Sequence, residues 1–429
     1  MKLLFGLEAL SAVDEMFILD DAKNVANICS AIIMEKCNID DLKRQLYDKA
    51  KKFFRTRAKL VKIMGKYYYK RMDDEEFNAK LSRFCQTDEN VRSEQDLADL
   101  MAKEAQIRDP FDQVQFKTVF FPNMSKTEVA FMFKAHHCLG DGLALVTLLT
   151  NLQDKYDKSQ LPQMRKFSFF EKIVMYVVTP LVGIKIILKQ LFFERKQKNA
   201  IKNGKPLTGK KNAVMSKDYS IEEIKKLSKK YGVTINDVLM TVTSQSLKQY
   251  LKLKGDDKTQ KMNLSMQISL REPPNTVEDF QLKNNFAMMT IPIDLVDDFK
   301  NNIQLMKKQM DKLKNSFDPM GVYFCVKIMS FLPSILAKLI FQDQAQKICM
   351  VFSNVPGPRT PLVFLGKKVN RIVFYAPQLG SIGVSLNIMS HVDNIKISCI
   401  ADEAQIPKPK ELMDIINDNF EKILSEVKQ

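Results

Sequence analysis

The stretch Val129–Asn151, VAFMFKAHHCLGDGLALVTLLTN, constrains the fold more than any other part of the chain. It holds two of the three histidines, and a Gly-Asp-Gly turn follows them almost at once. The residues before the histidines predict a strand, and the apolar run Leu143–Leu152 predicts a helix. The stretch therefore predicts a strand-turn-helix unit with His136 and His137 at the carboxyl end of the strand.

The two adjacent histidines are expected to face opposite sides of that strand, because side chains alternate along a strand. His137 would share a face with Phe131 and Phe133, and His136 would point the other way with Lys134. Two such histidines cannot ligate one ion, so no metal site is expected. A single imidazole beside a helix N-terminus suits a neutral general base, since the helix dipole disfavours imidazolium. The alternative is a buried histidine next to a surface histidine, with no catalytic role.

The charge of the chain narrows the possible partners. A net charge of +16 over 429 residues favours nucleic acid, an anionic membrane surface or a phosphorylated cofactor such as CoA. The lysines lack the aromatic-glycine signatures, zinc spacings and helix-turn-helix pattern of nucleic-acid binders, so nucleic acid is not expected. Seven cysteines without a CxxC spacing indicate reduced thiols in a cytosol-facing protein. Among them, Cys138 is expected to pack rather than to act as a nucleophile.

Strands and helices alternate in both halves of the chain, which predicts α/β layers twice over. The expected divisions are an N-terminal domain over residues 1–165, an apolar segment and basic linker over residues 166–212, and a C-terminal domain over residues 213–429. The basic part of the linker contains Gly204, Pro206 and Gly209, so it is expected to be exposed.

The apolar segment Phe169–Phe193 raises the question of a membrane. A spanning helix needs about 20 apolar residues, whereas lysines cut this run short and Pro180 and Gly183 interrupt it. We expect an amphipathic helix in the membrane plane or a surface lid, with a spanning helix and a buried helix as alternatives. The expected location is the cytosolic face of the endoplasmic reticulum or a lipid droplet, with peripheral attachment or anchoring through residues 169–193.

Several short motifs follow one another in a recognisable order. They are Leu10–Phe17, the HHxxxDG pattern of His136–Gly142, Thr234–Leu239, Ser269–Arg271 with Asn284-Asn285, SNVPGP at Ser353–Pro358, and Gly383–Asn387. Together they resemble the wax ester synthase/diacylglycerol acyltransferase family, within the CoA-dependent acyltransferase superfamily. The resemblance covers nearly the whole chain. Two departures are Gln115-Phe116-Lys117, where the family usually has Pro-Leu-Trp, and Asn285, where a Gly-Asn pair is common.

The resemblance implies a fold and a reaction. The fold would be two chloramphenicol-acetyltransferase-like domains that flank a central tunnel, with acyl-CoA entering from one face and an alcohol from the other. Acyl-CoA would be a co-substrate, and no permanently bound cofactor is implied. His137 would take the proton of the acceptor hydroxyl, His136 would support it, and no acyl-enzyme would form.

The remaining site residues also follow from the resemblance. Asp141 would hold the loop by pairing with an arginine, for which Arg55 is preferred over Arg57; an ordinary surface arginine is the alternative. Gly140 and Gly142 would let the backbone turn tightly. The residues expected to shape the tunnel are Asn236, Asp237, Ser353, Asn354, Pro356 and Gly357. For Asn236 and Asp237 the alternative is a helix cap.

The leading functional hypothesis is an O-acyltransferase that makes wax ester from a long-chain alcohol, triacylglycerol from diacylglycerol, or both. A second hypothesis keeps the fold and changes the acceptor to a sterol, a small alcohol or an amine. A third is a catalytically silent lipid-binding protein.

Overall fold

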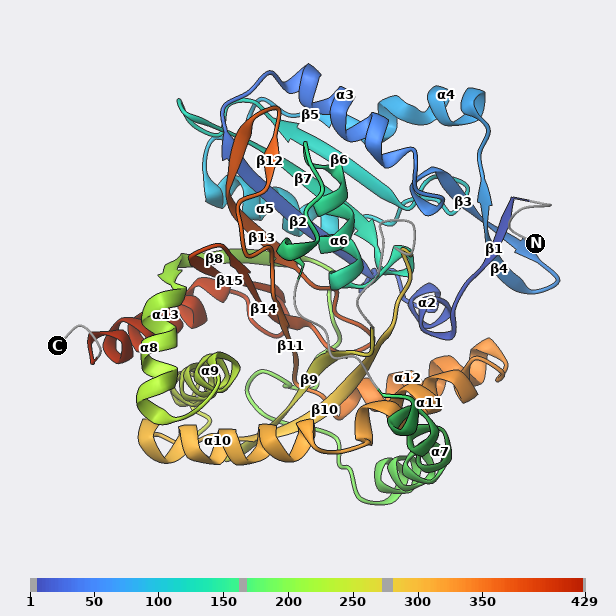
Figure 1. The fold of residues 1–429 in the computed structure, drawn as a ribbon. Helices are drawn as coiled ribbons and strands as arrows, with labels where there is room; N and C mark the ends of the chain where they lie inside the picture. Colours follow the sequence, from blue (N-terminus) through green and yellow to red (C-terminus); the bar gives the residue numbers. More distant parts are fainter. Residues whose placement is uncertain (1–5, 162–167, 272–280, 427–429) are drawn as a thin grey trace.

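The computed structural model describes residues 6–161, 168–271 and 281–426, and they are arranged around two six-stranded sheets (Figure 1). The first sheet has the order β12-β13-β2-β7-β6-β5. Its strands are β2 (Asn27–Glu35), β5 (Cys85–Thr87), β6 (Phe116–Phe121), β7 (Glu128–His136), β12 (Val363–Phe364) and β13 (Lys367–Tyr375).

The second sheet has the order β10-β9-β11-β14-β15-β8. Its strands are β8 (Lys211–Ser220), β9 (Lys261–Ser269), β10 (Phe286–Asp294), β11 (Met350–Val355), β14 (Val384–His391) and β15 (Asn394–Asp402). A smaller sheet of β1 (Leu7–Ala9), β4 (Lys66–Arg71) and β3 (Ala58–Ile63) lies beside the first. The two large mixed sheets confirm the predicted α/β layers.

Helices cover both sheets. Those of the first half are α2 (Ala12–Ile18), α3 (Ile39–Ala50), α4 (Asp74–Phe84), α5 (Glu94–Ala105) and α6 (Gly142–Leu152), with 3-10 turns η1 (Arg55–Arg57), η2 (His137–Leu139) and η3 (Lys158–Gln160). Those of the second half are α7 (Phe169–Phe192), α8 (Ile221–Tyr231), α9 (Ile235–Leu253), α10 (Phe299–Lys314), α11 (Asp318–Met329), α12 (Ser334–Gln346) and α13 (Pro409–Ser425).

The apolar faces of these helices decide which side of each sheet they cover. The inward side chains of α3, α4 and α6 share one core with the first sheet. The inward side chains of α5 share another core with the opposite face of that sheet and with Ala213 and Ile400 of the second sheet. Helices α8, α9, α10 and α13 bury the outer face of the second sheet. The inner face of the second sheet is therefore left to meet the first half of the molecule.

Two strands of the second half of the chain, β12 and β13, belong to the first sheet. Strand β13 follows β11 in the chain, yet it pairs antiparallel with β2 of the first sheet, from Val369↔Met34 to Tyr375↔Cys29. A long-range exchange of this kind leaves no local signature in a sequence, because the strand has the same apolar pattern whichever sheet it joins. The predicted division at residues 165 and 213 therefore separates the elements along the chain but not the sheets.

The basic linker after α7 is not exposed along its length, in contrast to the prediction. Ile201 is fully buried in the core of the second half, and the Lys202 ammonium donates to the carbonyl oxygens of Ala345 and Ser381 at 2.9 and 2.6 Å. Leu207 is also buried. The glycine, proline and lysine residues correctly predicted a loop. They do not indicate whether that loop packs against the rest of the protein or stays exposed.

The apolar segment forms one helix, α7, with Pro180 inside it. It packs against α11 at a crossing of two glycines: a Cβ on Gly183 would lie 2.7 Å from the Phe324 ring, and a Cβ on Gly321 would lie 2.6 Å from Val182. Gly183 therefore permits close helix packing and does not interrupt the helix. Within the described residues, no helix meets the length and hydropathy needed to cross a bilayer.

Candidate active site

The predicted strand-turn-helix unit is present. Strand β7 ends at His136, η2 begins at His137, and α6 begins at Gly142 with Asp141 as its N-cap. The Asp141 carboxylate accepts the Ala144 N–H at 2.9 Å, which satisfies one of the free amides of the first helical turn. The His137 N–H donates to the Ala26 carbonyl at 2.7 Å and so ties the turn to the chain just before β2.

His137 is 8% exposed, and its ring contacts two aromatic rings. The Phe17 ring stacks on it with centroids 3.9 Å apart, and the Phe286 ring lies at 5.6 Å. Burial in these surroundings lowers the pKa of His137 to about 4. The imidazole is therefore neutral at physiological pH. The sequence argument predicted a neutral ring from the helix dipole, whereas burial is the larger cause.

The His136 side chain has a different environment. Its Nε2 lies 3.3 Å from a carboxylate oxygen of Asp20. Burial opposes its charge, but the neighbouring Cys138 and the hydrogen bond with Asp20 outweigh burial and raise the pKa of His136 to about 9. The adjacent histidines thus have opposite pKa shifts, as side chains on opposite sides of a strand end can have.

A cavity of about 350 Å³ lies in front of His137, between the two halves. Both halves contribute to its wall, and the described residues that line it include Phe17, His137 and Leu143 from the first, and Ser265, Gln267, Arg271, Met288, Ser353, Asn354, Pro356 and Ala376 from the second. Three of the residues predicted to shape a tunnel, Ser353, Asn354 and Pro356, are therefore in that wall.

The other three predicted tunnel residues lie behind the wall. Asn236 accepts a hydrogen bond from the Asn354 amide at 3.0 Å. Asp237 is fully buried and forms a capping box with Thr234, the N-cap of α9. Gly357 packs under β14, where a Cβ would lie 2.0 Å from the Ser390 carbonyl. The alternative prediction for Asp237 was a helix cap. Asp237 does take part in the capping box of α9, but the N-cap residue itself is Thr234.

The arginine that pairs with Asp141 is Arg271, and the predictions of Arg55 and Arg57 were wrong. The Arg271 Nε lies 3.2 and 3.1 Å from the two carboxylate oxygens of Asp141. The Asn285 N–H donates to the same carboxylate at 2.8 Å. Arg271 follows β9, so this pair joins the histidine loop to the second half. The prediction looked for a partner within the first half and therefore missed a contact across the junction.

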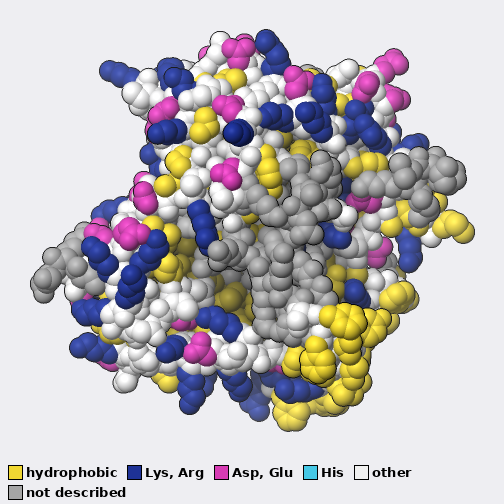
Figure 2. Space-filling model, in the orientation of Figure 1, with side chains coloured by type: hydrophobic (Ala, Val, Ile, Leu, Met, Phe, Trp, Pro, Cys, Tyr) yellow, Lys and Arg dark blue, Asp and Glu magenta, His cyan; other side chains and the backbone are white. Residues whose placement is uncertain are grey.

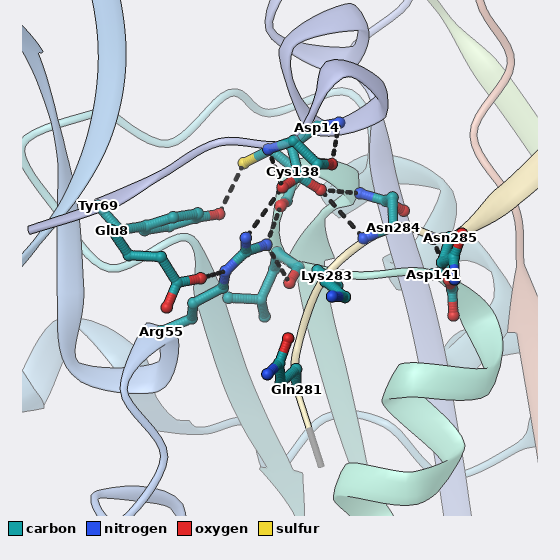
Figure 3. A network of polar contacts seen from close by, with 12 residues as sticks. Glu8, Asp14, Arg55, Tyr69, Cys138, Asp141, Gln281, Lys283, Asn284 and Asn285 are labelled. Atoms are coloured by element: carbon teal, nitrogen blue, oxygen red, sulfur yellow. Dashed lines mark hydrogen bonds and ion pairs between the residues drawn. The ribbon is translucent and has the colours of Figure 1, made fainter. Parts of the chain in front are cut away.

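Arg55 has a separate network, shown in Figure 3. Its guanidinium contacts Glu8 at 2.7 Å and the buried Asp14 at 2.9 Å, and it donates to the carbonyl oxygens of Cys138 and Leu139 at 3.1 Å. Arg55 therefore stabilises the backbone of η2 through these two carbonyl oxygens. The second candidate, Arg57, pairs with Asp74 at 2.5 Å on the far side of the turn.

Asn284 links the Arg55 network to the candidate base. Its side-chain amide donates to Asp14 and to the His137 carbonyl, both at 2.7 Å, and its backbone N–H donates to Asp14 at 3.1 Å. Figure 3 shows Asn284 and Asn285 on the segment that enters from the second half. The Asn284-Asn285 pair was part of the family resemblance. No pattern in the neighbouring sequence indicated that it would hydrogen-bond to the loop that carries His137 and Asp141.

The remaining chemistry-bearing groups do not suggest a metal or a thiol nucleophile. Within residues 6–161, 168–271 and 281–426, no group of three or more histidine, cysteine, aspartate or glutamate side chains has the arrangement of a metal site. Cys138 is fully buried, and its sulfur accepts a hydrogen bond from the Tyr69 hydroxyl at 3.1 Å. This side chain packs, as expected.

Comparison with known proteins agrees with this geometry. Residues 283–424 match the family model described as the WS/DGAT C-terminal domain. The wax ester synthase/diacylglycerol acyltransferase 2 of Arabidopsis thaliana is 26% identical over 335 residues, which is 68% of each chain. The solved structure of the wax ester synthase/diacylglycerol acyltransferase from Marinobacter aquaeolei VT8 superposes with a TM-score of 0.70 at 14% identity, covering 98% of this chain and 100% of that one.

A trichothecene 15-O-acetyltransferase from Fusarium sporotrichioides has the same TM-score, 0.70, at 12% identity, and the match covers 97% of this chain and 94% of that one. The two sheets, with a strand-end histidine facing the cavity between them, form the two-domain fold that this chain shares with these two acyltransferase structures. In sequence, the chain is similar to the wax ester synthase/diacylglycerol acyltransferases, and residues 283–424 match the C-terminal domain of that family.

Proposed function

We propose that this protein is an O-acyltransferase that moves a fatty acyl group from acyl-CoA to a lipid alcohol. The observation that carries the proposal is the position of His137: a neutral imidazole, stacked on Phe17, in the wall of a cavity that both halves line, on a backbone that Asn284 holds through the His137 carbonyl. A base in the wall of a cavity that both halves line suits direct transfer from one bound substrate to the other.

The reaction needs only this base. The acceptor hydroxyl oxygen bonds to the thioester carbonyl carbon, and His137 then accepts the hydroxyl proton. The tetrahedral intermediate then breaks its carbon–sulfur bond, and the departing thiolate takes the proton back from the imidazolium. A pKa of about 4 makes His137 a weak base in the resting site, but the hydroxyl becomes strongly acidic as its oxygen bonds to carbon, so proton transfer follows bond formation.

The acceptor is proposed to be a long-chain alcohol, a diacylglycerol or both. The support is the apolar part of the cavity wall, which includes Phe17, Phe286, Met288 and Leu379. The test is the purified protein with radiolabelled palmitoyl-CoA and a panel of hexadecanol, diacylglycerol, a sterol and a primary amine. Labelled wax ester or triacylglycerol is expected. A product from the sterol or amine alone would refute the proposed acceptor, and no product from any acceptor would refute the enzyme.

We propose that the protein works at a lipid surface, the cytosolic face of the endoplasmic reticulum or a lipid droplet. Figure 2 shows apolar side chains gathered where Figure 1 places α7, α11 and α12. We call this the apolar platform, defined by the exposed residues Phe169, Phe170, Tyr176, Val177, Leu181, Ile184, Leu188, Phe192, Ile328, Phe331, Ile335, Leu336 and Leu339. Contiguous apolar surface of this kind is unusual on a soluble monomer and marks a binding surface.

Charge and position both favour a lipid surface as the occupant of the platform. Lys185, Lys189 and Lys327 are exposed on its helices, and each basic side chain near an anionic membrane contributes about 1 kcal/mol. On its inner side, α11 and α12 pack through Tyr323, Val326 and Phe341 on the cluster that holds Phe17 and Phe286, the two rings that contact His137. A lipid alcohol dissolved in that surface would thus lie one helix away from the site.

The test is flotation with vesicles of phosphatidylcholine, with and without phosphatidylserine. We expect the wild type to bind the anionic vesicles more strongly and to be released by high salt. The double variant Phe331→Ser/Ile335→Ser should lose most of this binding, whereas Met64→Ser, a change at a 99% exposed residue of the β3–β4 turn, should not. Equal flotation of both variants would refute the platform, and release by detergent alone would refute peripheral attachment.

A further inference from the structure

The orientation of the His137 ring depends on an aromatic stack. Phe17 is 1% exposed, and its ring lies nearly parallel to the imidazole, with the centroids 3.9 Å apart and 15° between the planes. Phe286 also contacts the imidazole, but its centroid lies at 5.6 Å and its plane is tilted by 44°. Of the two rings, Phe17 is therefore the one that presents its face to the base.

No hydrogen bond at Nδ1 fixes the imidazole in the part of the chain that the structure describes. This nitrogen is inaccessible to solvent and has no partner there. Because His137 lines the cavity, Nε2 is the nitrogen left to take a proton, and Nδ1 then carries the ring hydrogen. Histidine bases often donate this N–H to a carboxylate or a carbonyl, which sets the ring plane and favours the imidazolium. His137 must obtain both effects from other groups.

The charged groups around His137 offset only part of the cost of its charge. Burial opposes the imidazolium most strongly, and the neighbouring His136 opposes it as well. The Asp141 carboxylate favours it, followed by the His137 main chain and the Asn284 side chain. Arg271 compensates much of the Asp141 charge, since its Nε lies 3.2 and 3.1 Å from the two carboxylate oxygens. Together these effects lower the pKa of His137 to about 4, so the cation that forms during transfer needs further stabilisation.

The face of the Phe17 ring supplies what the hydrogen bonds do not. An aromatic face carries negative partial charge, so a cation above it is attracted, and more strongly when both are desolvated. Two neutral rings instead prefer an offset or edge-to-face contact to a face-to-face one. The stack between Phe17 and His137 therefore becomes more favourable once the imidazole is protonated. An interaction that strengthens along the reaction lowers the barrier rather than the ground state.

The position of Phe17 is fixed by the same residues that fix the histidine loop. Phe17 lies on α2, one turn after the fully buried Asp14. The Asp14 carboxylate contacts Arg55 at 2.9 Å and accepts the Asn284 side-chain amide at 2.7 Å (Figure 3). Arg55 and Asn284 also donate to carbonyl oxygens of η2, including that of His137. The two stacked rings are thus held from one network.

We propose that Phe17 is a positioning residue for acyl transfer, which holds the plane of the His137 ring and stabilises the imidazolium formed when the acceptor hydroxyl gives up its proton. The inference rests on the proposed function, because it takes His137 as the base. The cation is short-lived, since the departing thiolate takes the proton back from Nε2. A ring face suits this task because it stabilises the cation without a carboxylate that would hold the imidazole protonated between turnovers.

The test weakens the ring face without changing its shape. The variant Phe17→trifluorophenylalanine, with fluorine at the three outer ring positions, withdraws electron density from the face and keeps the ring. We expect kcat to fall about three- to fivefold, with the KM values of palmitoyl-CoA and hexadecanol and the melting temperature unchanged. The same replacement at Phe420, a 1% exposed ring in the outer core of the second half, should leave kcat unchanged.

A second pair of variants separates the ring from its packing. Phe17→Leu removes the ring face and should lower kcat at least as much as fluorination does. Val13→Ala is the matched control, because Val13 is 2% exposed on the same helix and in the same apolar cluster but is not among the described lining residues of the cavity. It should lower the melting temperature and keep kcat.

Two results would overturn the proposal. One is a wild-type kcat in the fluorinated variant together with a slow Phe17→Leu, which would mean that Phe17 only fills space. The other is a raised KM with an unchanged kcat, which would mean that the ring contacts a substrate rather than acting through His137.

NMR of protein with labelled histidine separates this inference from the proposed function, because it needs no turnover. The chain has three histidines, and His137→Gln identifies the signal of His137. At pH 4.5, fluorination of Phe17 should reduce the protonated fraction of His137 about two- to fourfold. If no alcohol is acylated but the fraction falls, the proposed reaction is wrong and the role of the ring face stands. If acyl transfer is found but fluorination changes neither kcat nor the fraction, the ring face is wrong and the reaction stands.

Discussion

The ion pair between Asp141 and Arg271 is predicted to hold the two halves together at the active site, and a double-mutant cycle measures it. Both side chains are largely buried, with 8% and 12% exposure. Asp141→Asn keeps the helix cap, because asparagine caps as well as aspartate, but it leaves the Arg271 guanidinium with carbonyl partners only. Removing one partner of a buried pair costs about 3 to 5 kcal/mol, and we expect the lower value here.

The reverse change should cost less. In Arg271→Met the Asp141 carboxylate keeps the N–H donors of Ala144 and Asn285, so we expect a loss of about 2 kcal/mol. In the double variant neither charge is left unpaired, and the total should be near 3 rather than 5 kcal/mol. The coupling free energy is then about 2 kcal/mol, within the range for contacting residues.

Urea unfolding followed by circular dichroism gives the four free energies of the cycle. The matched control is the same cycle with Arg57, the buried arginine that pairs with Asp74 instead. Changes at Asp141 and Arg57 should add to within about 0.5 kcal/mol, because the two side chains share no partner. Coupling below about 0.5 kcal/mol for Arg271, or a larger value for Arg57, would refute the assignment.

Two further variants test the histidine loop. His137→Ala should lower kcat by about 10²- to 10⁴-fold with little change in melting temperature, whereas His136→Ala should lower the melting temperature through the lost contact with Asp20; equal activity of His137→Ala and wild type at saturating acyl-CoA would exclude the base. Asn284→Ala should destabilise the protein by about 2 kcal/mol through its lost bond to the buried Asp14 and lower kcat more than it raises KM. Unfolding and steady-state kinetics measure both effects, and a change in KM alone would show that Asn284 does not position His137.

Much of this architecture was predictable because it is local. The strand-turn-helix unit around His137 follows from the period of its apolar residues and from the Gly-Asp-Gly turn. Strand alternation predicted that His136 and His137 have different surroundings, and their opposite pKa shifts agree with it, whereas the choice of His137 as the base came from the family resemblance.

The parts that escaped prediction depend on contacts between distant residues. Arg271, Asn284 and Asp14 meet the histidine loop only because the second half docks against the first, and no spacing in the sequence reports that docking. The transfer of β13 to the first sheet and the burial of Ile201 in the linker have the same origin. Charge and propensity predict which residues need partners, whereas topology decides which partners they find.

The opposite pKa shifts of the two histidines give the last prediction. Burial lowers the pKa of His137 from 6.5 to about 4, and Cys138 and Asp20 raise that of His136 from 6.5 to about 9, against the effect of burial. Between pH 6.5 and 4 the unfolded chain binds a proton at His137 that the folded chain does not, so stability falls as the pH falls. Between pH 6.5 and 9 the folded chain holds a proton at His136 that the unfolded chain loses, so stability falls as the pH rises.

The two contributions together should give greatest stability near pH 6.5, and single variants separate them. In melting-temperature profiles, His137→Gln should flatten the acid side and His136→Gln the alkaline side, each without changing the other. The pH dependence of kcat/KM tests the pKa of His137 independently, because it reports the pKa of the catalytic base in the free enzyme. If His137 is that base, the rate keeps its full value well below pH 6.5 and declines only toward pH 4. A midpoint near 6.5 would mean that the base is solvated, and the buried imidazole beside Phe17 and Phe286 would not be the group that takes the proton.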